Sequence, residues 1–316
     1  MQAQHTDRQK AVPMFNAFQS KGQDDISRWL AKVSENPIVE AFPEKIDIHP
    51  GMDSSMLLST EMPAILSELV SKPRTRRTVA YINVPYCETR CFYCLFYIKP
   101  YRNKEESKAF ADTLIKELQL WSDKPVQKGE PVHAVYFGGG TPSYYGARRI
   151  VEILQELKVT NRLMKQSEIT VECNPDSVRR KELRMLRKEG VNRLSIGAQS
   201  ANDDILRLIG RRHNWRQVEM AVKRARKAGF RNVSLDLIYG LPSQTREDWA
   251  DTLTKALALK PAHISCYGLR LEEGTPMYDE YEGTDILPSD DDQADMYLYA
   301  VDFLSRHGFR QYEISN

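Results

Sequence analysis

From residue 79 onward, short apolar segments alternate with longer segments in which apolar residues recur at helical spacing. The strand-like segments are Val79–Val84, Ala134–Phe137, Glu168–Glu172, Arg193–Ala198, Asn232–Ile238 and His263–Tyr267. The helix-like segments are Glu105–Trp121, Ala147–Leu157, Val178–Lys188, Asp203–Ile209, Trp215–Lys227, Glu247–Leu259 and Asp291–Arg306. Strands that are joined through helices pair in parallel by right-handed crossovers. The sequence therefore predicts an α/β fold, either an open doubly wound sheet or a partly closed barrel.

Residues 1–78 differ from this alternating region, and we expect them to form an N-terminal extension that is partly disordered. Residues 1–24 are polar and weakly periodic, which is typical of a poorly ordered terminus. Helices are expected near Ile26–Val33 and from about Ala64 to Val70. The core is expected to run from residue 79 to residue 316.

Charge and hydropathy bound the classes of function. The chain has 316 residues, a formal net charge of only +2, and 41% hydrophobic residues, which is ordinary for a globular protein. This balance gives no general electrostatic argument for a nucleic-acid or membrane partner. No apolar run reaches transmembrane length, and the N-terminus lacks the apolar region of a signal peptide. We therefore expect a cytoplasmic protein.

Cysteine usage points to metal or redox chemistry. Cys87, Cys91 and Cys94 fall within eight residues, while Cys173 and Cys266 stand alone. An odd number of cysteines with such clustering argues against a disulfide framework. In a cytosolic chain, a tight cysteine cluster is typical of a metal or redox site.

The three clustered cysteines form a CxxxCxxC motif directly after the first predicted strand. A [4Fe–4S] cluster normally has four cysteine ligands. Three thiolates would hold three irons and leave the fourth iron open to a small molecule. A zinc site would need a fourth protein ligand, which His133 could supply, although it does not stand at finger-like spacing. Three buried, inert cysteines are the remaining alternative, and their close spacing makes it the least favoured.

The second and third predicted strands also end in residues suited to a ligand. In a barrel of this kind, the chemistry lies at the C-terminal ends of the strands. The second strand is followed by Gly-Gly-Gly-Thr-Pro at 138–142, which either admits a ligand close to the backbone or makes a tight turn. The third strand ends at Glu172, a carboxylate suited to a ligand ammonium or ribose hydroxyl, or to a surface ion pair.

Polar residues share one face of the next two strands. Ser195, Gly197 and Gln199 alternate with apolar residues, so they are expected on one side of the fourth strand. Asp236 stands within the apolar fifth strand, where an unpaired carboxylate would be costly. Its partner is expected to be either Arg211, through an ion pair, or a polar ligand.

Three further residues are expected to be structural. His263 begins the sixth strand and so lies at the wrong end of a barrel for the chemistry. Cys173 and Cys266 are expected to pack as small apolar residues.

From about residue 78 to residue 316, the chain resembles the radical S-adenosylmethionine (SAM) superfamily. Within it, the chain is most similar to the branch that contains oxygen-independent coproporphyrinogen III oxidase and the HemW haem chaperone. The motifs that carry the resemblance stand in order at 81–87, 87–94, 138–142, 172–175, 197–200, 210–213, 236–242 and 273–276. The resemblance implies a partial (β/α)6 TIM-like radical SAM barrel, with a further C-terminal domain beyond residue 316.

The resemblance also implies the roles of individual residues. Cys87, Cys91 and Cys94 would bind a [4Fe–4S] cluster whose open iron chelates SAM. One-electron reduction would then cleave SAM to a 5′-deoxyadenosyl radical, a chemistry that belongs to the cofactors. The positions that match SAM contacts of the branch are Tyr81, Tyr93, Gly139, Gly140, Thr141, Glu172, Gln199, Arg211, Asp236 and Gly268. The implied partners are haem or a porphyrin and a low-potential electron donor such as flavodoxin or ferredoxin, with no nucleic acid.

Two departures refine the resemblance. The coproporphyrinogen oxidase has a fourth cysteine two residues after the triplet, where this chain has Phe96. The segment at 36–42 and the Phe96-Tyr97 pair resemble the anaerobic haem-degrading methyltransferases of the HutW/ChuW type, the anaerobilin synthases. We therefore expect haem degradation by radical methylation and ring opening. The alternatives are a HemW-like haem chaperone, a coproporphyrinogen oxidase-like decarboxylase, and a zinc-stabilised binding module.

Overall fold

The computed structural model describes residues 62–101 and 103–314. The chain divides into two units, Met1–Ile65 and Leu66–Asn316, and the description below concerns the second. The helix expected near 26–33, the expected disorder at the N-terminus and the segment at 36–42 lie outside the described residues. The helix expected from residue 64 is α4, Met62–Val70.

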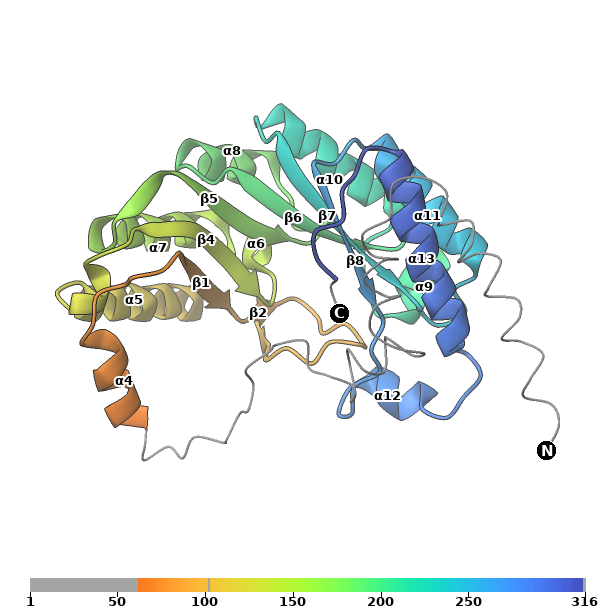
Figure 1. Ribbon diagram of the computed structural model, residues 1–316, viewed down its shortest axis with the longest axis horizontal. Helices are drawn as coiled ribbons and strands as arrows, with labels where there is room; N and C mark the ends of the chain where they lie inside the picture. The colour runs from red at the N-terminus through yellow and green to blue at the C-terminus, as the bar shows by residue number, and fades with distance from the viewer. Residues whose placement is uncertain (1–61, 102, 315–316) are drawn as a thin grey trace, which may run out of the picture. The chain divides into compact units, whose positions relative to one another are not determined.

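Six parallel strands form one sheet in the order β1-β4-β5-β6-β7-β8. Their bounds are Thr78–Val84, Val132–Gly139, Leu163–Cys173, Arg193–Gln199, Asn232–Tyr239 and His263–Gly268. The order in space follows the order along the chain without a reversal, so every crossover turns the same way. Figure 1 shows the sheet curving, with α5, α7, α8, α10 and α11 on its outer side. A doubly wound sheet would reverse its strand order, so the partial-barrel alternative is the correct one.

The predicted helices are present, with ends shifted by a few residues. They are α5 Lys104–Trp121, α7 Ala147–Thr160, α8 Arg180–Lys188, α9 Asp203–Leu208, α10 Trp215–Lys227, α11 Arg246–Ala258 and α13 Asp290–Arg306. Local sequence sets several of the starts. Asn214 and Thr245 form capping boxes at the first residues of α10 and α11, which satisfies backbone N–H groups that a helix start leaves free.

Periodicity missed the shortest elements and the full length of β5. The helices α6, Pro142–Tyr145, and α12, Pro276–Tyr281, are too short to show a helical repeat. The 3-10 turn η1, Pro125–Gln127, is also too short to show a repeat. The two-residue strands β2, Tyr86–Cys87, and β3, Lys99–Pro100, are too short to show the alternation of a strand. Near its start, β5 is exposed at Met164, Lys165 and Gln166, so this part lacks the apolar pattern by which a buried strand is recognised.

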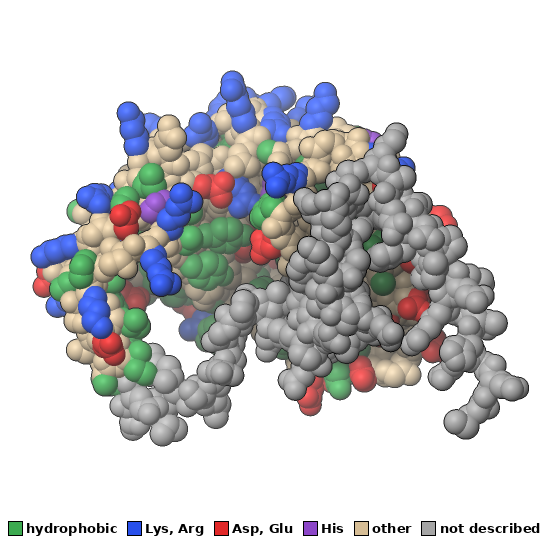
Figure 2. Space-filling view, viewed as in Figure 1, with side chains coloured by type: hydrophobic (Ala, Val, Ile, Leu, Met, Phe, Trp, Pro, Cys, Tyr) green, Lys and Arg blue, Asp and Glu red, His purple; other side chains and the backbone are tan. Residues whose placement is uncertain are grey.

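The core lies between the sheet and the helices outside it. Val135, Phe137 and Val171 of the sheet are fully buried, as is Leu154 of α7. Trp249 of α11 is also fully buried, and its indole Nε1 donates to the Met296 carbonyl of α13 at 2.8 Å. The indole N–H therefore stays paired where α11 packs against α13. Figure 2 shows that Lys and Arg side chains gather along the outer, helical side of the molecule.

The helix α7 allows a matched test of this packing. We expect Leu154→Ala, at a side chain with no exposed surface, to lower the free energy of unfolding by about 2–5 kcal/mol through lost burial and a cavity. The control is Val159→Ala on the same helix, where the side chain is 82% exposed, with an expected change within about 0.5 kcal/mol. Chemical denaturation measures both. Equal losses in the two variants would contradict the assigned burial.

Candidate functional site: the cysteine loop and the inner face of the sheet

The loop that carries the cysteines leaves the C-terminal end of β1 and is held at both sides. Its two ends pair as β2 and β3, with Tyr86 opposite Lys99. In the middle, the Phe92 N–H donates to the Ile209 carbonyl at 3.1 Å, and the Phe92 carbonyl accepts from Met277 N–H at 3.0 Å. The loop is therefore tied to the end of α9 and the start of α12 by its backbone.

The three thiols of the loop are free and half-buried. Cys87 Sγ lies 3.3 Å from Thr141 Oγ1, and Arg211 Nη1 lies 3.4 Å from Cys91 Sγ. Burial raises the pKa of Cys87 and of Cys94, and the charges of neighbouring thiolates add to this in both cases. The thiols are thus close enough to interact, and the Arg211 cation lies beside them.

This arrangement suits an iron–sulfur cluster better than a single ion. Among residues 62–101 and 103–314, no three His, Cys, Asp or Glu side chains are placed to hold one metal ion. In a cubane cluster each thiolate binds a different iron, so the thiols need to surround a larger group. The zinc alternative with His133 does not fit, because the residue next to it, Val132, pairs with Thr78 at the start of β1, whereas the cysteines follow its end.

The glycines at 138–140 bring two chain segments together. A Cβ on Gly139, where φ is +110°, would lie 2.2 Å from the side-chain oxygen of Asn83, and a Cβ on Gly140 would lie 2.8 Å from the Tyr86 carbonyl. Gly140 N–H donates to Val84 O, and Thr141 N–H donates to Tyr86 O, both at 2.8 Å. The glycines therefore fix the cysteine loop against the end of β4. The approach of a ligand to these glycines stays a prediction.

Glu172 faces the inner side of the sheet and accepts two hydrogen bonds. Tyr136 Oη donates to one carboxylate oxygen at 2.8 Å, and Gly139 N–H donates to the other at 3.2 Å. Burial outweighs these bonds and raises the pKa of Glu172 to about 7, with the nearby Asp236 carboxylate adding to the rise. A surface ion pair is therefore wrong for this residue, and a cationic ligand group would relieve its buried charge.

Asp236 is paired with serines, so the expected ion pair with Arg211 is wrong. Ser195 Oγ lies 3.0 Å and 2.8 Å from the two carboxylate oxygens of Asp236. Burial raises the pKa of Asp236, while hydrogen bonds from Ser195, Ser265 and Ser234 oppose the rise. The strand register explains this neighbourhood, because Asp236 of β7 stands beside Ser265 of β8.

Arg211 joins the cysteine loop to two strand ends. Its Nη2 donates to Asn174 Oδ1 at 2.9 Å and to the Gly197 carbonyl at 2.8 Å, while Nη1 points to Cys91. Its Nε lies 3.3 Å from His213 Nδ1. Burial, followed by the Arg211 charge, lowers the pKa of His213 to about 3, so the imidazole is neutral. A neutral ring can accept from Arg211 through Nδ1 and donate through Nε2 to the Ala198 carbonyl, 3.1 Å away.

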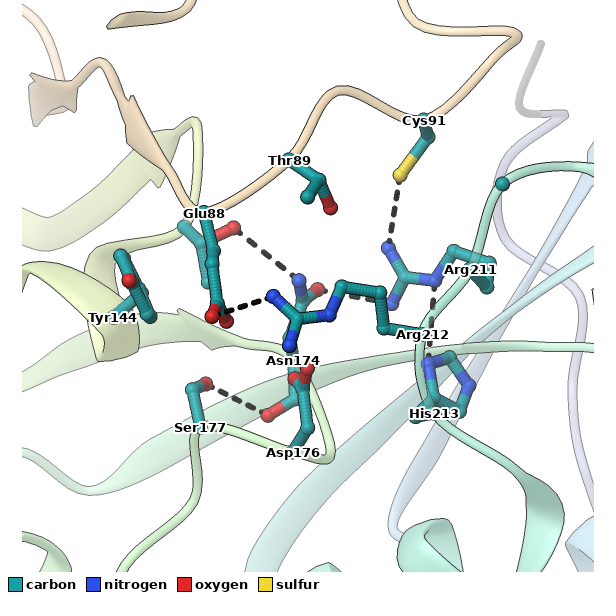
Figure 3. Close-up of a pocket in the computed structure, with 12 residues that line it drawn as sticks. Glu88, Thr89, Cys91, Tyr144, Asn174, Asp176, Ser177, Arg211, Arg212 and His213 are labelled. Carbon is teal, nitrogen blue, oxygen red and sulfur yellow. Dashed lines mark hydrogen bonds and ion pairs between the residues drawn. The ribbon is translucent and has the colours of Figure 1, made fainter. Parts of the chain in front are cut away.

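A pocket opens beside these residues (Figure 3). Its lining residues are Glu88, Thr89, Cys91, Thr141, Tyr144, Asn174, Asp176, Ser177, Gly210, Arg211, Arg212 and His213. Figure 3 shows Glu88 and Arg212 facing each other across it, and their ion pair measures 2.5 Å. Three of the residues expected from sequence therefore line it: Cys91, Thr141 and Arg211. Sequence reasoning did not assign roles to Asn174, Arg212 and His213, although they stand within two of the motifs.

The other expected contacts lie outside this pocket lining. Gln199 has a backbone φ of +62° and lies just after a register shift between β6 and β7. A Cβ added to Gly197 would lie 2.8 Å from the side-chain nitrogen of Gln199. Tyr81 is 57% exposed and stacks on Tyr136 with ring centroids 5.9 Å apart. Gly268, at the end of β8, packs against the Tyr239 hydroxyl. These positions stay predictions as SAM contacts.

Tyr93 lies within the cysteine loop itself. Burial and the thiolates of Cys91 and Cys94 raise its pKa, and the Arg211 cation opposes this. It also packs against the smaller apolar cluster that contains Ile209 and Met277. Its role as a SAM contact stays a prediction.

His263, Cys173 and Cys266 lie away from the cysteine loop. The imidazole of His263 lies 2.7 Å from Ser234 Oγ and 2.7 Å from the Tyr312 hydroxyl. Cys173 is buried in the main core, and Cys266 is partly buried against the same core. These contacts are what a structural role requires.

A curved parallel sheet with three thiols at its C-terminal edge defines a class of iron–sulfur enzyme core, and the family comparison names that class. The chain belongs to the radical SAM superfamily, whose family model matches residues 81–256. The haem chaperone HemW of Lactococcus lactis is 37% identical over 249 residues, which is 78% of this chain and 63% of that protein. HemW of Bacillus subtilis is 36% identical over 246 residues, 75% of this chain and 62% of that protein.

Solved structures give the same grouping. The structure of coproporphyrinogen III oxidase HemN from Escherichia coli, a radical SAM enzyme, matches with a TM-score of 0.70 and 28% identity, covering 80% of this chain and 58% of that one. The structure of native anSMEcpe with bound AdoMet matches with a TM-score of 0.54 at 13% identity, which supports the fold alone. The chain thus spans about 60% of the length of these relatives. Among the described residues, every helix is too short or too polar to cross a bilayer.

Glu172 gives the site a pH signature. Because folding raises its pKa to about 7 from 4.5, the folded chain holds a proton that the unfolded chain loses between these values. The free energy of unfolding should therefore fall as pH rises through this window, by at most about 3 kcal/mol. In Glu172→Gln this loss should disappear, whereas Glu117→Gln, at an exposed position on α5, should keep it. Thermal unfolding from pH 4 to pH 8 measures the difference, and identical profiles for all three proteins would refute the assignment.

Proposed function

We propose that this chain is the radical SAM core of a haem-binding protein of the HemW type, which carries haem and does not break it down. The support is the similarity to two bacterial haem chaperones together with a cysteine loop of three thiols. Cysteine chemistry alone would fit any member of the superfamily. The chaperone similarity is what narrows the proposal to a tetrapyrrole.

The residues that would hold the cofactors lie on three neighbouring segments. Cys87, Cys91 and Cys94 would bind a [4Fe–4S] cluster, and when bound, the cluster and SAM supply the one-electron reductive cleavage of SAM. Arg211 offsets the negative charge of the thiolates through its contact with Cys91. Glu172 would accept the ammonium of SAM, since its partly buried carboxylate has only neutral donors around it.

An apolar surface next to the cluster ligands fits a flat macrocycle. Leu95, Phe96 and Tyr97 follow Cys94 directly and are 50%, 66% and 69% exposed. Consecutive exposed side chains of this kind are uncommon away from binding surfaces. A porphyrin ring would cover them and stack on the aromatic rings. We therefore place the haem side of the site on these residues.

Haem degradation is the second candidate, and Phe96-Tyr97 is the observation that favours it. It was the function expected from the sequence, but the two bacterial relatives described above are haem chaperones, so the carrier hypothesis now comes first. A coproporphyrinogen oxidase-like activity is less favoured, because Phe96 stands where that enzyme has its fourth cysteine.

The cluster assignment predicts a loss specific to three cysteines. After anaerobic reconstitution, Cys91→Ser should hold far less iron and sulfide and lose absorbance near 400 nm, since a serine is a poor ligand for these irons. Cys266→Ala removes a thiol that packs in the core, so it should keep the iron content of the wild type. Iron and sulfide analysis of both variants measures this. Equal iron content would contradict the proposed ligands.

The haem assignment is tested with haem, SAM and a reductant under anaerobic conditions. We expect the reconstituted chain to bind haem and to return it unaltered while SAM is cleaved. Phe96→Ser combined with Tyr97→Ser should weaken haem binding about tenfold, a loss of about 1.4 kcal/mol. The control is Val159→Ser, an exposed apolar residue on α7. Absorbance titration and product analysis measure binding and fate, and haem destruction would favour the second candidate.

A further inference from the structure

The near-zero net charge of the chain conceals a strongly basic face. The helices α8 and α10 adjoin each other on the outer side of the sheet (Figure 1), and Figure 2 shows Lys and Arg side chains along this part of the molecule. We call the exposed cations and methionines of these helices, together with Arg179 just before α8, the basic face: Arg179, Arg180, Lys181, Arg184, Met185, Arg187, Lys188, Arg216, Met220, Lys223 and Lys227. Glu219 is the one exposed carboxylate among the described residues of these two helices.

The cations of this face are largely free of carboxylate partners. Other exposed helices of the chain pair their charges at i,i+4, as Lys108 does with Asp112 on α5 and Lys255 with Asp251 on α11. Among the described residues, no cation of the basic face makes an ion pair. Arg180 and Lys181 even stand in the first turn of α8, where the helix dipole disfavours positive charge. An ordinary solvated helix surface would mix its charges.

The uncharged residues of the face favour a protein partner. Met185 of α8 and Met220 of α10 are 37% and 41% exposed among the cations. Flexible methionines are common on surfaces that bind other proteins. Single-stranded nucleic acid is bound by aromatic side chains that stack on bases, and none of the exposed residues of α8 and α10 is aromatic. The chemistry thus fits a protein with an acidic surface.

The face begins beside the pocket that contains Cys91. The pocket residues Asp176 and Ser177 lead directly into Arg179 and α8. The pocket residue His213 leads into Arg216 at the start of α10, and Arg212 lies at the pocket itself. A protein docked on the first turns of these two helices would therefore sit next to the proposed cluster.

We propose that the basic face docks a small acidic redox protein that reduces the cluster. This rests on the proposed function, because it needs the cluster on Cys87, Cys91 and Cys94. One electron leaves the reduced flavin or iron centre of the partner, which is oxidised, and enters the oxidised cluster, which is reduced by one electron. Complementary charge would speed the encounter by tenfold or more at low ionic strength.

Charge reversal at the start of α8 tests the proposal. The variant Arg180→Glu with Lys181→Glu should fold, because glutamates suit the first turn of a helix. The control, Lys116→Glu with Lys165→Glu, makes the same charge change at exposed positions on α5 and β5. An acidic flavodoxin is the probe. We measure its binding affinity, and the rate at which its reduced form reduces the reconstituted cluster, at several salt concentrations.

The docking face predicts that the α8 variant binds flavodoxin at least tenfold more weakly and is reduced by it at least tenfold more slowly at low salt. The control should change less than twofold, and the wild-type rate should fall steeply with salt. Reduced methyl viologen, a small cation that needs no docking face, should reduce all three proteins equally well. Equal flavodoxin rates in variant and control would overturn the inference. The inference would also be overturned if the α8 variant lost binding to a DNA duplex or to anionic vesicles while its binding to flavodoxin was unchanged. If methyl viologen reduced no cluster in the wild type, the α8 variant or the control, that result would instead refute the proposed function.

Discussion

The site depends on the close approach between the end of β4 and the start of the cysteine loop. Two backbone hydrogen bonds, from Gly140 to Val84 and from Thr141 to Tyr86, join these segments at 2.8 Å each. They can form because Gly139 and Gly140 have no Cβ that would meet Asn83 and the Tyr86 carbonyl. Without this approach, Thr141 would not reach Cys87, and the cysteine loop would lose its backbone hydrogen bonds to the end of β4.

The rest of the site is arranged around one partly buried cation, Arg211, and two partly buried carboxylates, Glu172 and Asp236. Arg211 donates to Asn174 and to the Gly197 carbonyl while it faces Cys91, so a single guanidinium links two strand ends to the proposed cluster. The two carboxylates are kept apart from it. Asp236 is held by serines, and Glu172 by a tyrosine and a backbone amide. A positive ligand group would therefore pair with these partly buried carboxylates on the inner face of the sheet, while Arg211 already lies beside Cys91.

The similarity to haem chaperones moves the proposed function from haem degradation, which the sequence suggested, to haem transport. The motifs identified the superfamily correctly, because each is a short run of residues at fixed spacing. Whether haem is carried or degraded was inferred from Phe96, Tyr97 and a segment outside the described residues. Two side chains near a cluster cannot settle a reaction, because the outcome depends on how the whole substrate is held.

The sequence by itself determined the α/β alternation, the sheet-end position of the cysteine motif and the residues able to bind a cluster. These follow from local periodicity and from ligand chemistry. Only the tertiary structure decided that the sheet is a partial barrel, since strand order depends on pairing between distant segments. It alone showed that Asp236 is bound by serines, that Arg211 faces Cys91, and that α8 and α10 join their cations into one face. These pairings arise from packing of residues far apart in the chain, which no spacing along the sequence encodes.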